Sequence, residues 1–211
     1  MNEKLLKEGL SALGIDLNKR KYTLLCGFIE ELALWNKKYN LVNAAGDEII
    51  TKHILDSLSG LRLLKSFPHR KIADIGSGGG FPGIPLAVFL PRTEFFLIER
   101  SGKKCGFLRN VSGILSLNNI VIKEMPLDKF NIESDIVTFR AFSKINNCLK
   151  DLLGATREGG IIAAYKGKKT QIESEIKKMD HRPHKLEIHP LDVPFLKEER
   201  HMVIIHKTRG N

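Results

Sequence analysis

KIADIGSGGGFPGIP, residues 71–85, carries a short apolar run followed by a cluster of glycines. The run ends at Asp74 and Ile75, and five glycines fall within residues 76–83. Glycine has no Cβ, so the backbone can turn sharply there and approach a ligand closely. A helix opens near Pro82. A strand, a glycine-rich turn and a helix in this order are typical of the first unit of an open α/β sheet, whose carboxyl edge binds cofactors.

Downstream of this turn, short apolar runs alternate with stretches of helical periodicity. The pattern predicts strands at 71–76, 94–99, 120–124, 135–140, 159–167, 185–189 and 201–207. It predicts helices near 84–89, 101–117, 143–153 and 169–179. Strands that alternate with helices indicate an α/β fold with a mostly parallel sheet covered on both faces.

The part of the chain before this region is predicted to be helical. Leucines at helical spacing begin at Leu5, Asn18 can cap a second helix, and a third helix is expected over 47–65. Its inward face should carry five apolar residues: Ile50, Ile54, Leu58, Leu61 and Leu64. We expect residues 1–66 to form an N-terminal helical extension packed on a core of residues 67–211, as one structural unit.

Composition narrows the function classes. The chain has 211 residues, 42% of them hydrophobic, which suits one globular α/β domain with an appendage. A formal net charge of +10 favours a polyanionic partner, although many basic proteins have none. The three cysteines, Cys26, Cys105 and Cys148, form no CxxC pair. With no signal-like start and no membrane-length apolar run, we expect a soluble, cytoplasmic protein.

Three cofactor classes compete for the glycine turn. A P-loop is excluded because no Gly-Lys-Ser/Thr follows the glycines. A GxGxxG dinucleotide site fits Gly76 and Gly78, but Phe81 stands where the third glycine belongs. S-adenosylmethionine fits best, because the acid Asp74 suits its cationic groups. Glu99 ends the next strand and can accept both ribose hydroxyls of an adenosine, a feature shared with nicotinamide enzymes. A nicotinamide-dependent oxidoreductase therefore remains an alternative.

DIGSGGGFPGIPLA (74–87) resembles the signature of the ribosomal RNA small subunit methyltransferase G family, also called glucose-inhibited division protein B. Further similar segments span most of the chain: WNKKYNL (35–41), HILDSL (53–58), ERSGKKCGFLRN (99–110), RAF (140–142), YKG (165–167) and ERHMVIIHK (199–207). The resemblance implies a class I S-adenosylmethionine-dependent methyltransferase fold, with a seven-stranded sheet in which 201–207 is antiparallel. It also implies methylation at N7 of a guanine in the 530 loop of 16S ribosomal RNA.

The resemblance also assigns site residues. Gly76 and Phe81 match cofactor contacts, and Leu127 and Asp128 match a pair beside the adenine. Arg140 matches an arginine of the cofactor or target site. The chain departs from relatives at Pro126, where an arginine is common, which weakens any mechanism that needs two arginines in the pocket. With the residues found above, the predicted cofactor site is Asp74, Gly76, Gly78, Phe81, Glu99, Leu127, Asp128 and Arg140.

Methylation of guanine N7 needs no general base, because this nitrogen carries a lone pair and no proton. Catalysis would come from holding N7 in line with the methyl group and the sulfur. We predict no certain catalytic residue, with Arg140 and Lys166 as candidates that position the target. Basic residues near the strand ends are predicted to bind RNA: Lys103, Lys104, Arg109, Lys166, Lys168 and Arg200.

His181, His184 and His189 lie close together, but the segment contains prolines and lacks cysteine partners. We therefore expect a loop there and no metal site. The expected partner is 16S ribosomal RNA or the small ribosomal subunit, with no membrane contact, and the expected state is a monomer. A non-catalytic RNA-binding or ribosome assembly module on the same fold remains a further alternative.

Overall fold

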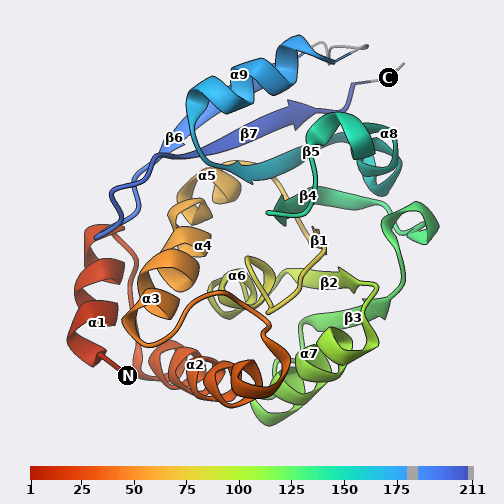
Figure 1. Ribbon diagram of the computed structural model, residues 1–211. Helices are drawn as coiled ribbons and strands as arrows, with labels where there is room; N and C mark the ends of the chain where they lie inside the picture. Colours follow the sequence, from red (N-terminus) through yellow and green to blue (C-terminus); the bar gives the residue numbers. More distant parts are fainter. Residues whose placement is uncertain (180–184, 209–211) are drawn as a thin grey trace.

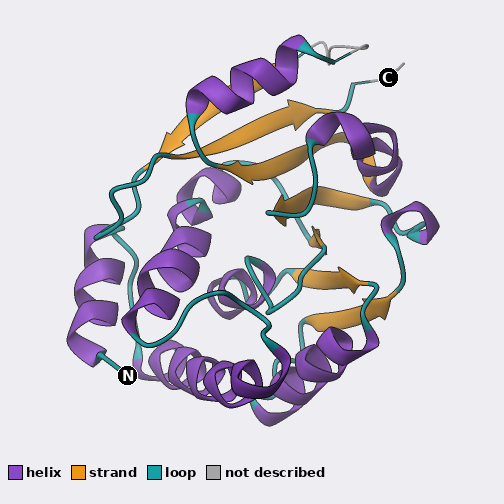
Figure 2. Ribbon diagram, viewed as in Figure 1, coloured by secondary structure: helices purple, strands orange, loops and turns teal. Residues whose placement is uncertain are grey.

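The computed structural model describes residues 1–179 and 185–208, and within them seven strands form one sheet in the order β3-β2-β1-β4-β5-β7-β6. Figure 2 shows this sheet running through the middle of the molecule with helices on both sides. The strands are β1 (Lys71–Ile75), β2 (Glu94–Glu99), β3 (Ile120–Glu124), β4 (Ser134–Arg140), β5 (Thr156–Lys166), β6 (Leu186–Leu191) and β7 (Arg200–His206).

The helices are labelled in Figure 1, and none in the described part of the chain is long and apolar enough to cross a membrane. Five precede the sheet: α1 (Glu3–Ala12), α2 (Lys19–Tyr39), α3 (Asp47–Ile49), α4 (Asp56–Ser59) and α5 (Leu61–Lys65). Four alternate with strands: α6 (Gly83–Phe89), α7 (Gly102–Ile114), α8 (Ile145–Ala155) and α9 (Lys169–Lys177). A π-helical turn, η1 (Ile50–Leu55), and a 3₁₀ turn, η2 (Leu127–Lys129), complete the set.

The directions of the strands confirm the predicted sheet. β1 pairs in parallel with β2 and β4, and the outer pairs β2–β3 and β4–β5 are also parallel. β7 is antiparallel to both of its neighbours, β5 and β6. Because β7 runs the opposite way, its first residue, Arg200, lies at the edge where β5 ends with Lys166. The antiparallel strand thus brings a late segment of the chain to the edge of the sheet that binds ligands in folds of this type.

Alternate strand residues enter two apolar cores, one on each face of the sheet. In β2, Phe95 and Leu97 join the core that also contains the buried faces of α1, α2, α6 and α7. Phe96 and Ile98 join the opposite core, which includes buried residues of α8 and α9. This alternation follows from the two-residue period of a strand. It leaves both faces covered, as the near-continuous apolar character of the strands predicts.

The N-terminal helices contribute directly to the first core. The side chain of Asn18 caps α2 by accepting from the Lys21 N–H at 2.9 Å, as predicted. The expected helix over 47–65 is present as the series α3, η1, α4 and α5, with a π-helical turn that periodicity did not reveal. The five residues expected on its inward face are all buried. Other limits shift by a few residues: the strand expected at 185–189 is β6, and β5 begins at Thr156.

Phe28 of α2 tests whether the extension and the sheet unfold together. Its buried ring lies 5.2 Å from the Phe81 ring and 6.4 Å from the Phe107 ring, between centroids. We expect Phe28→Ala to lower the free energy of unfolding by about 3–5 kcal/mol, because the cavity spans both parts. Leu34→Ala, an exposed change on the same helix, should cost less than about 0.5 kcal/mol.

The measurement is urea unfolding followed by circular dichroism and by the fluorescence of Trp35 on α2. Coincident curves for both probes are expected for one unit. Separate transitions for the helices and the sheet would contradict this expectation.

Candidate functional site

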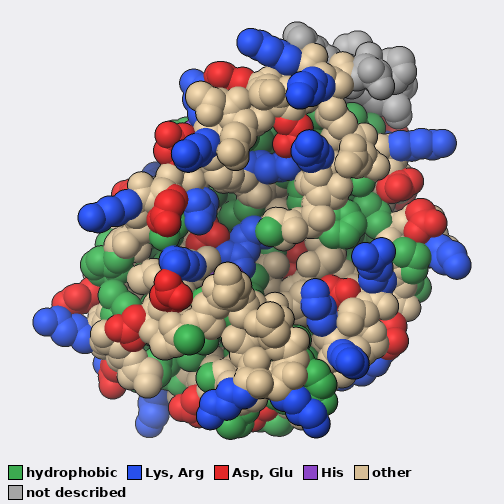
Figure 3. All heavy atoms as spheres, viewed as in Figure 1, with side chains coloured by type: hydrophobic (Ala, Val, Ile, Leu, Met, Phe, Trp, Pro, Cys, Tyr) green, Lys and Arg blue, Asp and Glu red, His purple; other side chains and the backbone are tan. Residues whose placement is uncertain are grey.

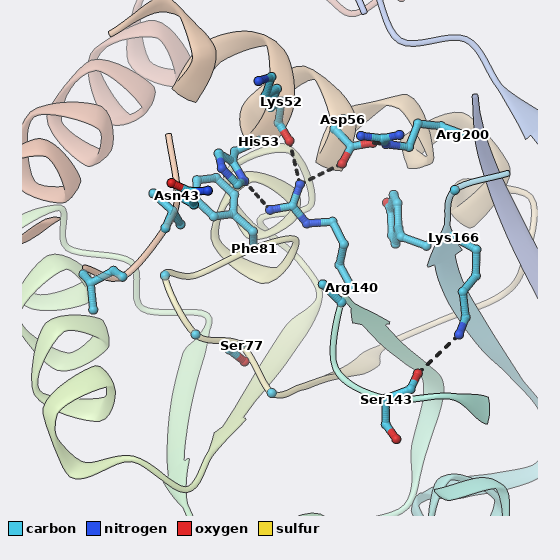
Figure 4. Close-up of a pocket in the computed structure, with 18 residues that line it drawn as sticks. Asn43, Lys52, His53, Asp56, Ser77, Phe81, Arg140, Ser143, Lys166 and Arg200 are labelled. Carbon is cyan, nitrogen blue, oxygen red and sulfur yellow. Dashed lines mark hydrogen bonds and ion pairs between the residues drawn. The ribbon is translucent and has the colours of Figure 1, made fainter. Parts of the chain in front are cut away.

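A pocket of about 540 Å³ opens at the carboxyl edge of the sheet. Its floor is the glycine turn after β1, and its walls come from the ends of β4 and β5, the start of β7, and the N-terminal segments around Val42 and His53. Figure 4 shows these side chains converging from separate elements. Six residues predicted from the sequence line the pocket: Gly76, Gly78, Phe81, Arg140, Lys166 and Arg200.

The turn presents its backbone to the pocket at Gly78. This residue has a φ of 53°, a conformation that glycine adopts with little strain. A Cβ added at Gly78 would have the Gly76 carbonyl oxygen, 3.6 Å away, as its nearest neighbour in the described structure. The position is therefore restricted by its φ and not by protein packing. An open, Cβ-free surface of this kind fits the nucleoside-type cofactor predicted from the sequence.

Two buried carboxylates support the turn from below. Oδ2 of Asp74 accepts from the Gly83 N–H at 3.0 Å, while Oδ1 has no hydrogen-bond partner among the described residues. Complete burial raises the pKa of Asp74 to about 7. The Glu99 oxygens accept from the N–H groups of Gly78, at 3.1 Å, and Ser101, at 2.9 Å. Each Glu99 oxygen keeps a lone pair for a further donor, so its proposed ribose contact stays a prediction.

Neither Asp74 nor Glu99 lines the pocket, and the same is true of the predicted pair Leu127 and Asp128. Leu127 begins η2 and is buried in the second core, whereas the Asp128 side chain is exposed. These four roles in cofactor binding therefore stay predictions.

Arg140, at the end of β4, is held by three partners from the N-terminal extension. Nη1 donates to the Asp56 carboxylate at 2.7 Å and to the Lys52 carbonyl at 2.8 Å, and Nη2 donates to Nδ1 of His53. The Arg140 side chain is 15% exposed, so it is not an ordinary surface arginine. These bonds fix the guanidinium at the pocket wall (Figure 4).

His53 is fixed in its neutral form by the same contacts. Since its Nδ1 accepts from Arg140, the ring proton belongs on Nε2. Burial and then the Arg140 charge lower the pKa of His53 to about 3. The imidazole stacks on the Phe81 ring with 4.9 Å between centroids, and the Arg140 guanidinium lies 5.2 Å above that ring. Phe81, which belongs to the glycine turn, thus packs against both His53 and Arg140.

His53 and Asp56 are the site residues that the sequence reasoning missed. They lie three positions apart, so they share one side of the helical series, and η1 contains His53 and ends directly before Asp56. A buried acid among the apolar residues of that series was the available signal. π-helical turns are rare and often occur at functional sites.

Lys166 is also anchored. Its Nζ lies 3.1 Å from Oε2 of Glu175 and donates to the Ser143 carbonyl at 3.2 Å. Beyond it lies a second hollow of about 500 Å³, which shares Lys166 and Gly167 with the pocket and is also lined by Lys144, Lys168 and Lys178. The predicted RNA contact Lys168 therefore lies beside the pocket and not in it.

The other predicted RNA contacts lie on α7, which begins directly after β2. Lys103 and Lys104 are in its first turn, at the same edge of the sheet as the pocket. Arg109 lies further along the helix and donates to Glu124 at 2.8 Å. Figure 3 shows Lys and Arg side chains gathered around a hollow in the middle of this face. The face therefore suits an anion, although RNA contact by each residue stays a prediction.

The described residues contain no cluster of three or more His, Cys, Asp or Glu side chains that could hold a metal. His181 and His184 lie outside the described residues. His189 is in β6, where its Nε2 lies 3.1 Å from Oε2 of Glu187.

The lowered pKa of His53 predicts a dependence of stability on pH. In the unfolded chain the imidazole titrates near 6.5, and in the folded chain near 3. The unfolded state therefore binds the extra proton, so the contribution of neutral His53 is complete above pH 6.5 and is lost as pH falls toward 3. His53→Asn removes this titration and should flatten the decline in unfolding free energy below pH 6.5.

Urea unfolding at a series of pH values measures the effect, and the NMR signals of the His53 ring report its titration directly. A His53 ring that titrates with a midpoint near 6.5 in the folded protein would show that this assignment is wrong.

Solved structures of other proteins have the same fold as this chain. A putative O-methyltransferase from Klebsiella pneumoniae has a TM-score of 0.64 at 15% identity, covering 97% of both chains. An S-adenosylmethionine-dependent O-methyltransferase from Thermotoga maritima has a TM-score of 0.60 at 17% identity, covering 87% of this chain and 72% of the other. The fold is thus the class I methyltransferase fold.

Proteins that are similar in sequence indicate the family of this chain, which the solved structures do not. A protein named ribosomal RNA small subunit methyltransferase G from Treponema pallidum (strain Nichols) is 41% identical, over 96% of this chain and 93% of its own. A protein of the same name from Borrelia turicatae (strain 91E135) is 36% identical, over 94% of this chain and 96% of its own. Another from Acinetobacter baumannii (strain SDF) is 34% identical, over 96% of both chains. The model of the rRNA small subunit methyltransferase G family matches residues 21–203. Together with the glycine turn and with Arg140 and Arg200 in the pocket, these matches show that the chain belongs to the rRNA small subunit methyltransferase G family.

Proposed function

We propose that this protein transfers a methyl group from S-adenosylmethionine to N7 of one guanine in the 530 loop of 16S ribosomal RNA. The observation that carries the proposal is the composition of the pocket. An open glycine turn lies on one side, and Arg140, Lys166 and Arg200 lie on the other, in a chain of this family. S-adenosylmethionine, when bound, supplies a methyl group attached to a cationic sulfur.

The chain's part in such a reaction is to bind and orient. Arg140 has five N–H donors, and three are used by Asp56, Lys52 and His53. The two that remain can donate to guanine O6 or to a phosphate. A donor placed on N7 itself would occupy the reacting lone pair, so O6 is the contact compatible with N7 transfer. Neutral His53 and ion-paired Asp56 fit a mechanism without a general base.

The test is to incubate the protein with methyl-labelled S-adenosylmethionine and small-subunit rRNA, both as free RNA and within ribosomal subunits that lack the modification. We expect label at N7 of one guanine. Label on another base would refute the assignment of the position, and no label in either substrate would refute the activity. Stronger binding of NAD than of S-adenosylhomocysteine would favour the oxidoreductase alternative.

Gly78 provides the test of the cofactor site. In Gly78→Val, a branched side chain would enter the open space above the turn. We expect the affinity for S-adenosylhomocysteine to fall at least about 100-fold, or about 2.7 kcal/mol, measured by calorimetry. Gly14→Val is the matched control, because Gly14 also has a positive φ, 65°, and a Cβ there meets no atom within 4 Å. Unchanged affinity in Gly78→Val would place the cofactor elsewhere.

Arg140 provides the test of target positioning. Arg140→Lys keeps the charge but loses the planar fork. We expect kcat/KM for rRNA to fall about 5- to 150-fold, equivalent to about 1–3 kcal/mol for one directed contact to a base. Affinity for S-adenosylhomocysteine and for RNA should change little. Wild-type turnover in this variant would show that Arg140 does not position the target.

The contrasting variant is Lys103→Ala with Lys104→Ala. These side chains should act through phosphates, so RNA binding should weaken and the slope of log affinity against log salt should fall by about 0.7–0.9 per lysine. Turnover at saturating RNA should be kept. An unchanged salt slope would remove these lysines from the RNA-binding surface.

A further inference from the structure

Phe142 is a large apolar side chain that the structure leaves in solvent. It is 40% exposed and lies two residues after the end of β4. Its neighbours on both sides, Ala141 and Ser143, line the pocket. An isolated exposed apolar residue is common on protein surfaces, but this one, although it does not line the pocket itself, lies in the chain between two residues that do.

The backbone is bent in a costly way to put the ring there. Ala141 has a φ of 52°, in the left-handed region that residues with a Cβ rarely adopt. Past this turn, the Phe142 ring lies against Gly76, so closely that a Cβ on Gly76 would come within 2.4 Å of Cδ2. Gly76 is therefore the residue that makes room for the ring.

The ring is supported from inside the protein. It meets the buried Phe139 ring edge-on, with 6.3 Å between centroids and 69° between planes. Support by Phe139 and Gly76 orients the ring, while its exposed part remains available for contact. The ring is thus an oriented aromatic surface beside Gly76 of the glycine turn, two residues after Arg140.

A planar base is the ligand that such a surface fits. A guanine that reacts in a pocket must leave its stack in the RNA, and it loses stacking energy when it does so. Proteins that hold single-stranded RNA replace this energy by stacking bases on aromatic rings. Apolar burial of the exposed part of the ring adds to the gain.

We propose that Phe142 is the platform on which the target guanine stacks, so that Arg140 holds an edge of the base while Phe142 holds a face. The inference rests on the proposed function, because it takes rRNA as the substrate. It gives Phe142 a role in base capture and none in cofactor binding. The contact explains why an apolar ring is kept exposed on a bent backbone.

The variants are Phe142→Leu, which keeps apolar volume without the aromatic face, and Phe142→Trp, which keeps that face. We expect Phe142→Leu to lower kcat/KM for rRNA about 5- to 150-fold, the range for the loss of one base–aromatic stack. Phe142→Trp should keep most of the activity, and its added tryptophan fluorescence should be quenched when substrate RNA binds. Affinity for S-adenosylhomocysteine should be unchanged in both variants, which also shows that they are folded.

Phe195→Leu is the matched control. Phe195 is 55% exposed and lies between β6 and β7, and neither of its neighbours lines the pocket, whereas both neighbours of Phe142 do. It should keep wild-type activity. An equal loss in Phe195→Leu would mean that exposed aromatic residues contact RNA in general, and would overturn the specific role of Phe142.

Two further results would also overturn the inference. Wild-type kcat/KM in Phe142→Leu would show that no stack forms, and a loss of activity that follows a loss of S-adenosylhomocysteine affinity would assign Phe142 to the cofactor site. If the wild-type protein transfers no methyl group to rRNA, the proposed function fails, and the inference fails with it. If the wild type methylates rRNA and Phe142→Leu equals it, only the inference fails.

Discussion

The Asp56 carboxylate carries its charge where almost no water reaches it, since the residue is 2% exposed. Arg140 binds one oxygen, and Nε of Arg200 lies 3.3 Å from the other, as an ion-pair contact without the alignment of a hydrogen bond. A buried charge without partners is very costly, and removing one partner of a buried pair typically costs about 3–5 kcal/mol. The rest of the pocket depends on this carboxylate because it joins the N-terminal helices to β4 and β7.

The position of the carboxylate explains why the helical extension is part of the site. Tyr165 of β5 adds a second link by donating to the Ser57 carbonyl at 2.7 Å. Neighbouring residues of one helical segment therefore hold the ends of three strands. The sheet supplies the ends at one edge, and the extension fixes the side chains that project from them.

Local patterns were enough to predict much of this structure. Alternating apolar runs indicated the strands, and Asn18 indicated the start of α2, because both signals act over a few residues. The glycine turn and Arg140 were found because strand ends meet at one edge in a parallel sheet. The antiparallel direction of β7 came from family resemblance and not from its residues.

The rest depends on distant contacts. Nothing near Asp56 in the sequence shows that its partners are 84 and 144 positions away, at Arg140 and Arg200. The engagement of Lys166 by Glu175 and of Arg109 by Glu124 was hidden for the same reason. Asp74 was predicted to face the cofactor, which stays a prediction, and what the structure shows is that its bond to Gly83 closes the turn.

The distance in sequence between these partners also sets the order in which the site can form during protein synthesis. Asp56 leaves the ribosome long before Arg140, and Arg200 follows later still. Until Arg140 has been added, the emerging helices carry an acid whose charge is not matched, and it is better kept in water than buried. Helix α4 can therefore dock firmly only after β4 has been made, and a chain cut short before Arg200 would still lack the second arginine beside Asp56.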